Sequence, residues 1–388
     1  MRVLFISGAD DKYGAPKALM GLIETLIKEY GIEAVVLTKK HNQVNDWCDS
    51  RGIKNYSFWY RDIMAGSAYR HSILNLCKHC VKFLCYLWGG ITQNFILYKY
   101  PELANVDLIH TNLNRLDIGG YIAAKCNVPH ICHLRELRSG HSKIIAYTPD
   151  AERKMNHKTD KFIAISDITK KNWVMSGLPE DKIELIYNGI AIEKYKTAKQ
   201  VGFEKLKIVC TGRIEENKGQ AQIIEAIGRL PQIVKNRTEL ILIGEAYSEY
   251  ENYLMKLIGK YGLDDQVTFM GYCSNVEQII RDCNIGITCS KGEAFGRVTI
   301  EYMASGLLAL VSNTGANQEI VTHMETGLIY NYGDFDDLSH QLIFIFENPS
   351  VCSEIVQRSQ KAAENFSQDK NAQKIYGVYR TLMTEYSE

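Results

Sequence analysis

The chain has 388 residues, which exceeds one typical domain and predicts two domains, given a usual domain size of about 150 residues. Its 45 basic residues balance its 45 acidic residues, so the overall charge gives no indication of a nucleic-acid partner. The 11 cysteines are scattered and odd in number, which argues against the disulfide framework of a secreted protein and predicts a cytoplasmic chain.

The first half of the chain alternates short apolar runs with longer helical patterns. Residues 3–7 predict a buried strand, and the run lacks the length and cleavage site of a signal peptide. Residues 16–30 carry leucine and isoleucine at helical spacing, directly after a loop that contains Gly14. Further strands are predicted at residues 34–38, 108–111, 130–133 and 162–166. This alternation is typical of parallel βα units.

Residues 56–100 are rich in aromatic and basic side chains. The most apolar stretch, residues 81–98, is interrupted by Lys82 and by two glycines, so a membrane-spanning helix is not expected. Two alternatives remain: a helical layer whose aromatic side chains pack inward, and a surface that rests on a membrane. The side chains that would suit a membrane surface are Trp59, Tyr60, Arg61, Arg70, Lys78, Lys82, Phe83 and Trp88.

A polar, lysine-rich interval separates this half from a second series of short apolar runs. The runs lie at residues 207–211, 239–243, 266–270, 285–289 and 308–312, and they are typical of a parallel sheet covered by helices on both faces. The fold class is therefore α/β, with two doubly wound domains and a cleft at the carboxyl ends of their strands. The expected division is a first domain at 1–192, a linker at 193–206, a second domain at 207–370, and a helix at 371–388 that packs back on the first domain.

The most informative motif runs from Glu293 to Glu301 and reads E-A-F-G-R-V-T-I-E. In a continuous helix the two carboxylates would lie about 12 Å apart, too far to flank one bond as the acid and base of a hydrolase. If the helix begins near Arg297, both carboxylates and several unpaired N–H groups face one anion-binding spot. That arrangement suits a sugar diphosphate, because carboxylates bind hydroxyls and the helix start binds phosphate. The alternative is a helix-start charge and a solvated glutamate.

A second motif, T-G-R-I-E-E-N-K-G at residues 211–219, follows a predicted strand and precedes a helix. It places Arg213 and Lys218 on one loop. Arginine offers a planar fork to phosphate oxygens and lysine adds a point charge, which suits a leaving group that gains negative charge. The alternative is a pair of solvated surface cations.

Three motifs, taken in order, resemble those of the retaining GT-B glycosyltransferases of family 4. They are Y-N-G-I at 187–190, G-R-x-x-x-x-K-G at 212–219 and the motif at 293–301. The similarity extends over nearly the whole chain. It implies a GT-B architecture of two Rossmann-like domains, and transfer of a sugar from a nucleotide diphosphate sugar without a metal or other cofactor. The sequence agrees in lacking an Asp-x-Asp run after a predicted strand.

The resemblance also implies a role for each matching residue. Glu293 would bind hydroxyls of the donor sugar and Glu301 those of the ribose, while Gly14 would let backbone approach the diphosphate. His133 matches the histidine near the sugar, with His110 and His130 as alternatives. The expected catalytic residues are His133, Arg213, Lys218 and Glu293. The expected donor-binding residues are Gly14, Arg213, Lys218, Tyr272, Glu293, Ala294, Phe295, Gly296, Arg297, Val298 and Glu301, and those on the acceptor side are Asn112, Arg135 and Glu136.

The expected reaction moves a hexose or N-acetylhexosamine, from a UDP-sugar by preference, to a hydroxyl of a glycan or lipid-linked acceptor. The setting implied is polysaccharide biosynthesis at the inner face of the membrane. Two alternatives are another GT-B enzyme, such as a sugar-nucleotide epimerase, and a noncatalytic subunit that binds a sugar nucleotide. The charged residues of both motifs favour the transferase.

Three segments depart from the family pattern. Residues 13–15 lack the second glycine of many relatives, residues 306–308 lack a common proline, and residues 315–319 lack the usual glycine pair and proline. The departures concern the detail of the donor pocket, whereas the cations expected to bind the diphosphate are present.

Overall fold

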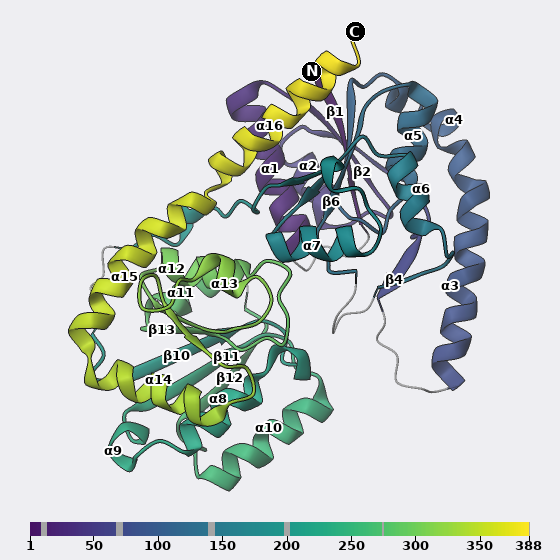
Figure 1. Cartoon of the computed structure of the whole chain (residues 1–388). Coiled ribbons are helices and arrows are strands. Elements are labelled where there is room, and N and C mark those ends of the chain that lie inside the picture. Colours follow the sequence, from purple (N-terminus) through teal and green to yellow (C-terminus); the bar gives the residue numbers. More distant parts are fainter. Residues whose placement is uncertain (9–13, 67–72, 139–143, 198–201, 274, 388) are drawn as a thin grey trace. The chain divides into compact units, whose positions relative to one another are not determined.

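The computed structural model describes residues 1–8, 14–66, 73–138, 144–197, 202–273 and 275–387. The chain divides into unit 1, which comprises Met1–Gly189 with Gln368–Glu388, and unit 2, which comprises Ile190–Ser367. Each unit is a parallel sheet with helices on both faces, as the sequence predicts (Figure 1).

The sheet of unit 1 has seven strands in the order β3-β2-β1-β5-β6-β8-β9, all parallel. Their bounds are β1 Arg2–Ser7, β2 Glu33–Thr38, β3 Lys54–Ser57, β5 Leu108–Thr111, β6 His130–Leu134, β8 Lys161–Ala164 and β9 Ile183–Leu185. A small antiparallel pair, β4 (Met64–Gly66) and β7 (Ile144–Ala146), lies outside this sheet. The five predicted strands correspond to β1, β2, β5, β6 and β8. The short edge strands β3 and β9 were not predicted.

The helices of unit 1 are α1 Gly14–Tyr30, α2 Gln43–Asp49, α3 Ile73–Thr92, α4 Ile96–Lys99, α5 Ile118–Cys126, α6 Ala151–His157, α7 Asp167–Met175 and α16 Gln368–Glu385. The apolar face of α1 packs on the sheet through Leu19, Leu22 and Leu26, which is the helical spacing seen in the sequence. Helix α16 lies beside α1 and buries Ile375 and Tyr379 in the same core (Figure 1). The last segment of the chain is therefore part of unit 1.

The sheet of unit 2 has six parallel strands in the order β12-β11-β10-β13-β14-β15. Their bounds are β10 Leu206–Thr211, β11 Thr238–Ile243, β12 Val267–Gly271, β13 Ile285–Thr288, β14 Leu308–Ser312 and β15 Leu328–Tyr330. The helices are α8 Gln220–Gly228, α9 Gln232–Lys235, α10 Ser248–Tyr261, α11 Val276–Arg281, α12 Arg297–Ala304, α13 Asn317–Ile320, α14 Phe335–Glu347 and α15 Pro349–Ala363. The five predicted strands are β10 to β14.

The boundary between the units differs from the expected one. Residues 193–206 were expected to be a linker, but this segment belongs to unit 2. Phe203 and Leu206 are buried in the unit 2 core, and β10 begins at Leu206. The lysines at residues 193–206 made this segment look polar, so Phe203 and Leu206 were not recognised as core residues.

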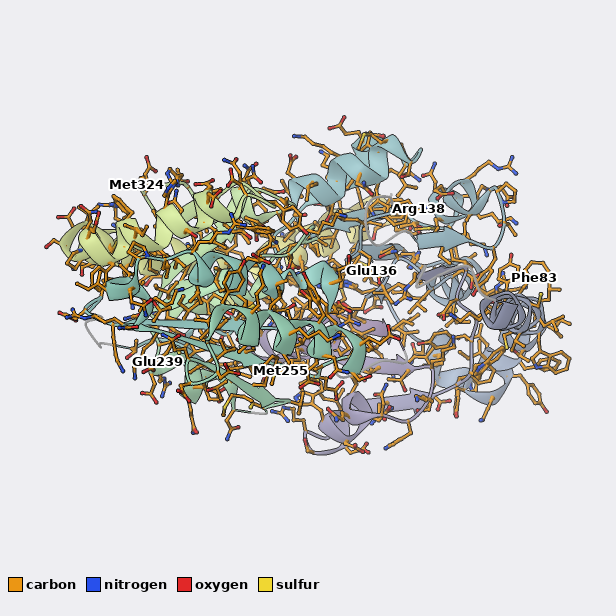
Figure 2. The ribbon with its side chains drawn as sticks, turned by 90° about the horizontal axis from the view of Figure 1, so that it is seen from below. Phe83, Glu136, Arg138, Glu239, Met255 and Met324 are labelled. Atoms are coloured by element: carbon orange, nitrogen blue, oxygen red, sulfur yellow. The ribbon has the colours of Figure 1, made fainter. Side chains whose placement is uncertain are left out.

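Helix α3 leaves an unusual number of large apolar side chains exposed. Figure 2 views this helix nearly along its axis, with Phe83 labelled. Val81, Leu84 and Trp88 are each about 60% exposed. Tyr86, in contrast, is 8% exposed and packs into an apolar core cluster of unit 1. Over residues 80–92, where the side chains are described, Tyr86 packs inward as an aromatic layer would, whereas Trp88 does not. Tyr60, expected at a membrane surface, is fully buried and donates its hydroxyl to the carbonyl oxygen of Ser7. None of the helices described is long and apolar enough to cross a membrane.

Candidate functional site

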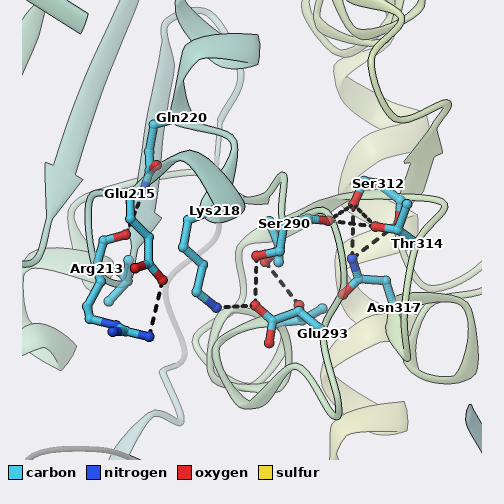
Figure 3. A network of polar contacts seen from close by, with 12 residues as sticks. Arg213, Glu215, Lys218, Gln220, Ser290, Glu293, Ser312, Thr314 and Asn317 are labelled. Carbon is cyan, nitrogen blue, oxygen red and sulfur yellow. Dashed lines mark hydrogen bonds and ion pairs between the residues drawn. The ribbon is translucent and has the colours of Figure 1, made fainter. Parts of the chain in front are cut away.

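In unit 2, the predicted charged residues gather at the carboxyl edge of the sheet (Figure 3). Because the strands are parallel, the loops that follow β10, β13 and β14 lie along one edge. The loop after β10 supplies Arg213 and Lys218, and the loop after β13 supplies Glu293. The Lys218 ammonium forms an ion pair with Oε1 of Glu293, and Arg213 Nη2 lies 3.1 Å from a carboxylate oxygen of Glu215.

The Lys218–Glu293 pair is only partly accessible to water. The two side chains are 29% and 19% exposed, and the Ser290 hydroxyl donates to the same Glu293 oxygen at 2.7 Å. Burial acts to raise the pKa of Glu293, but Lys218 and the Ser290 hydrogen bond outweigh it and hold that pKa below its ordinary value. Burial acts to lower the pKa of Lys218, and Glu293 outweighs this effect, so the pKa of Lys218 is raised. Both groups are therefore charged at neutral pH.

Two glycines allow the loops to approach one another closely. Gly219 ends the Lys218 loop with a φ of +72°, and a Cβ there would lie 2.2 Å from the carbonyl oxygen of Cys289. Gly315, in the loop after β14, has a φ of +59°, and its Cβ would lie 2.3 Å from the backbone nitrogen of Glu293. Any other residue would push the Glu293 loop away from its present position.

Helix α12 begins at Arg297, as the sequence predicts. Gly296 precedes it with a φ of +93° and provides no side-chain cap. This N-terminal end of the helix carries the positive end of the helix dipole. Glu301 lies one turn along α12, 3.8 Å from a guanidinium nitrogen of Arg297, and Phe295 is buried against Phe366.

Some predicted donor residues lie apart from the Lys218–Glu293 pair. Tyr272 is 62% exposed after β12, the edge strand, which β11 and β10 separate from β13. In unit 1, Gly14 is the first residue of α1. The predicted glycine loop begins at residue 10, and its residues 10–13 lie outside the described residues.

A second polar cluster lies at the carboxyl edge of the unit 1 sheet. Arg135, which follows β6 and is 7% exposed, donates from Nε to Oδ1 of Asn112 at 2.8 Å and from Nη1 to Oδ1 of Asn188 at 2.5 Å. His133 is 1% exposed, and its Nδ1 lies 2.6 Å from Nε2 of His110. The structure thus joins the predicted residues Asn112, His133 and Arg135 through direct contacts.

Burial determines the charge state of the two histidines. It lowers the pKa of both His110 and His133 well below 6.5, and the nearby Arg135 guanidinium lowers each further. Both imidazoles are therefore neutral at physiological pH. His130, the other alternative, is held by Thr111 at 2.8 Å and by the Lys158 carbonyl oxygen at 2.7 Å, which is typical of a packing residue.

Glu136, predicted on the acceptor side, is held by its surroundings. Its carboxylate lies 2.9 Å from Nε of Arg115, and its carbonyl oxygen accepts a hydrogen bond from Trp173 Nε1 at 2.8 Å. Burial raises the pKa of Glu136 despite the arginine. Glu136 is therefore held in an ion pair with Arg115.

Sequence reasoning missed several polar residues that support these two clusters. In unit 2 they are Ser290, Ser312, Thr314 and Asn317, which bond to each other or to Glu293 (Figure 3). In unit 1 they are Tyr379, whose hydroxyl bonds to Nδ1 of His110, and Asn188, which lies in the Y-N-G-I motif but was given no role. Their position directly after strands was the available signal for the unit 2 set, whereas nothing local indicates that Tyr379 meets His110.

Two family models match the chain. Residues 192–364 match "Glycosyl transferases group 1", and residues 66–194 match "Glycosyltransferase Family 4". Among solved structures, the UDP complex of HepE from Anabaena superposes with a TM-score of 0.80 at 20% identity, covering 98% of this chain and 100% of that one. This likeness establishes the fold, which is the GT-B architecture of two Rossmann-like domains.

Curated relatives are similar at a low level of identity. The putative glycosyltransferase EpsD of Bacillus subtilis is 24% identical over 253 residues, covering 62% of this chain and 65% of that protein. The phosphatidyl-myo-inositol mannosyltransferase of Mycobacterium leprae is 26% identical over 235 residues, covering 58% and 60%. The match therefore spans less than two thirds of the length of these two relatives. On the two adjoining family models and the shared fold, the chain belongs to the group 1 glycosyltransferases of family 4.

Proposed function

We propose that the chain is a retaining, metal-independent glycosyltransferase that uses a nucleotide diphosphate sugar, with a UDP-sugar preferred. The observation that carries this proposal is the group formed by Arg213, Lys218 and Glu293 beside the N-terminal end of α12. Cations and helix N–H groups suit a diphosphate, and a carboxylate suits sugar hydroxyls. The UDP and UDP-glucose complexes of HepE, which has the same fold, support the choice of nucleotide.

The residues divide into two roles. In unit 2, Arg213, Lys218 and the N–H groups at residues 297–298 would bind the diphosphate, Glu293 the donor sugar and Glu301 the ribose. In unit 1, His133 would contact an oxygen of the sugar, with Asn112, Arg135 and Glu136 on the acceptor side. Gly14 would let the backbone approach the diphosphate.

The proposed reaction requires no protein nucleophile. An acceptor hydroxyl attacks the anomeric carbon from the face that the nucleotide leaves, so the configuration is retained. The bond from the anomeric carbon to the phosphate oxygen breaks, the bond to the acceptor oxygen forms, and the acceptor proton passes to the departing phosphate. Arg213, Lys218 and the α12 dipole would stabilise the charge that develops on the diphosphate.

Calorimetric titration of the full chain tests the donor site. UDP, GDP and their hexose and N-acetylhexosamine conjugates are titrated with EDTA present, into wild type and Arg213→Ala. We expect one nucleotide to bind, and the variant to bind it at least about tenfold more weakly, since a charged hydrogen bond is worth about 1.5–3 kcal/mol. Absence of binding to every nucleotide contradicts the proposal, as does binding that appears only when a divalent ion replaces EDTA.

We also propose that α3 rests on the membrane that carries a lipid-linked acceptor. Val81, Leu84, Trp88 and Ile91 follow one another at intervals of three or four residues, so they form one stripe on the helix, and each is more than 50% exposed. Lys82 on α3 and Lys99 on α4 are exposed and add positive charge to this part of unit 1, which would favour anionic headgroups. An exposed apolar stripe is typical of a helix that lies at a lipid surface.

Vesicle flotation tests this second proposal. Wild type should float with vesicles that contain anionic phospholipid, and Leu84→Glu/Trp88→Glu should not, because two charges would enter the apolar boundary. Met255→Glu on α10 is the matched control, since Met255 is also about half exposed but lies on unit 2. Equal flotation of all three proteins contradicts the membrane contact. A change of oligomeric state in the double variant would show instead that the stripe covers a second copy of the chain.

A further inference from the structure

Three buried side chains from distant parts of unit 1 form a continuous line of hydrogen bonds. The Tyr379 hydroxyl of α16 bonds to Nδ1 of His110 on β5, and Nε2 of His110 lies 2.6 Å from Nδ1 of His133 on β6. Each of the three is at most 1% exposed. The remaining ring nitrogen, Nε2 of His133, is buried and has no hydrogen-bond partner among the described residues. The line therefore ends at one unsatisfied atom of a predicted site residue.

The donor and acceptor properties of the three groups determine which atom donates in each hydrogen bond. A neutral imidazole carries one N–H donor and one acceptor nitrogen. The phenol O–H of Tyr379 is the stronger donor of the first pair, so Nδ1 of His110 accepts and the proton of His110 is on Nε2. That N–H donates to Nδ1 of His133, which leaves the proton of His133 on Nε2.

The position of Arg135 agrees with this direction. Its Nη2 lies 3.4 Å from Nδ1 of His133, and a guanidinium has no acceptor. A proton on Nδ1 of His133 would face both this cation and the ring of His110. Burial and Arg135 also lower the pKa of both histidines and keep them neutral, so neither ring carries a proton on both nitrogens.

We propose that Tyr379 and His110 are positioning residues that fix the proton of His133 on Nε2, so that His133 donates a hydrogen bond to an oxygen of the sugar and does not act as a general base. An unsatisfied buried N–H is costly, and an incoming oxygen would satisfy it. The tautomer follows from unit 1 alone, whereas its use on a sugar rests on the proposed function. The line also makes α16 a part of the site, because the helix supplies its first donor.

Nitrogen-15 NMR of the full chain, labelled at histidine, tests the tautomer directly. His133→Gln assigns the resonances. Between about pH 6 and about pH 8 we expect wild-type His133 to be neutral, with Nδ1 unprotonated and Nε2 protonated. In Tyr379→Phe the first donor is lost, so His110 and His133 should exchange between tautomers. A wild-type proton on Nδ1 of His133, or an unchanged tautomer in Tyr379→Phe, overturns the proposal.

Two variants at His110 distinguish a role in positioning the His133 proton from a role in packing alone. A glutamine amide can donate to Nδ1 of His133 as the imidazole N–H does, whereas leucine cannot. His110→Gln should keep the tautomer and keep kcat within about threefold of wild type, and His110→Leu should lose the tautomer and at least about tenfold in kcat. Equal losses in both variants mean that His110 serves packing only. If no nucleotide sugar binds, the proposed function fails, and the tautomer is still decided by the spectra.

Discussion

Lys218→Met should destabilise unit 2 by leaving a buried carboxylate without its cation. Removing one partner of a fully buried ion pair costs about 3–5 kcal/mol, while an unsatisfied buried group costs about 1–3 kcal/mol. The Lys218 and Glu293 side chains are 29% and 19% exposed, so water screens part of the pair and the lower range applies. We expect a loss of about 2 kcal/mol in the free energy of unfolding, or about 4–8 °C in the melting temperature of a unit of this size.

The pH dependence of this loss has a definite sign. The pKa of Glu293 is below its ordinary value, so its stabilisation is present above about pH 4.5 and disappears as the pH falls through the folded pKa. In Lys218→Met, burial is the first remaining influence and raises the pKa of Glu293, so protonation of Glu293 should begin at a higher pH. The gap between wild type and variant should therefore shrink as the pH is lowered toward 4.

The assay can separate the units because all four tryptophans, at positions 47, 59, 88 and 173, lie in unit 1. Tryptophan fluorescence follows unit 1 and far-ultraviolet circular dichroism follows both, so their difference reports unit 2. The control is Lys218→Met/Glu293→Gln, in which the neutral amide no longer needs a cation. It should recover most of the lost stability. If Lys218→Met costs as much in the Glu293→Gln background as in wild type, the pair is not the cause and the reasoning is refuted.

The remaining predictions concern one loop and the two clusters. Gly315→Ala should lower the stability of unit 2 by about 1–2 kcal/mol and weaken UDP binding, whereas Gly333→Ala, also at positive φ but with no atom near its Cβ, should cost less in the same urea titration and leave binding unchanged. Arg135→Leu should raise the pKa of His133 toward its ordinary value, as read by histidine NMR, and an unmoved pKa would show that burial alone sets it. Glu215→Gln should strengthen UDP binding up to about fivefold in calorimetry, because Arg213 would no longer be held by an exposed ion pair, and weaker binding would mean that Glu215 orients Arg213 for phosphate.

Local pattern was sufficient for the central strands and for the start of α12. The apolar runs at β1, β5, β10 and β14 are continuous because those strands are buried on both faces, and that burial is what the sequence displays. The edge strand β3, K-N-Y-S, has one side open to water and no such run. The interval at 193–206 looked like a linker for another reason, because its lysines outnumber the buried Phe203 and Leu206.

Partners that meet through tertiary structure could not be predicted. Lys218 and Glu293 are 75 residues apart and His110 and Tyr379 are 269 residues apart, so neither pairing has a local signature. The family resemblance supplied the residues of the first pair and the ligand expected for them. The resemblance did not indicate that Tyr379 contacts His110, because the helix that carries Tyr379 shows only an apolar periodicity in the sequence.

The charges of the unit 2 cluster indicate how it can discriminate between ligands. Arg213 and Lys218 are each paired with a carboxylate, so these four side chains carry no net charge. General attraction for anions is therefore expected to be weak, so discrimination would depend on geometry: the planar guanidinium of Arg213, the ammonium of Lys218 and the N-terminal end of α12. Under the proposed function, a diphosphate would use these donors together, while Glu293 would repel an anion that brings no hydroxyl group. Such a site would favour a diphosphate joined to a sugar over a simple phosphate, because only the joined ligand would use the cations and the carboxylate together.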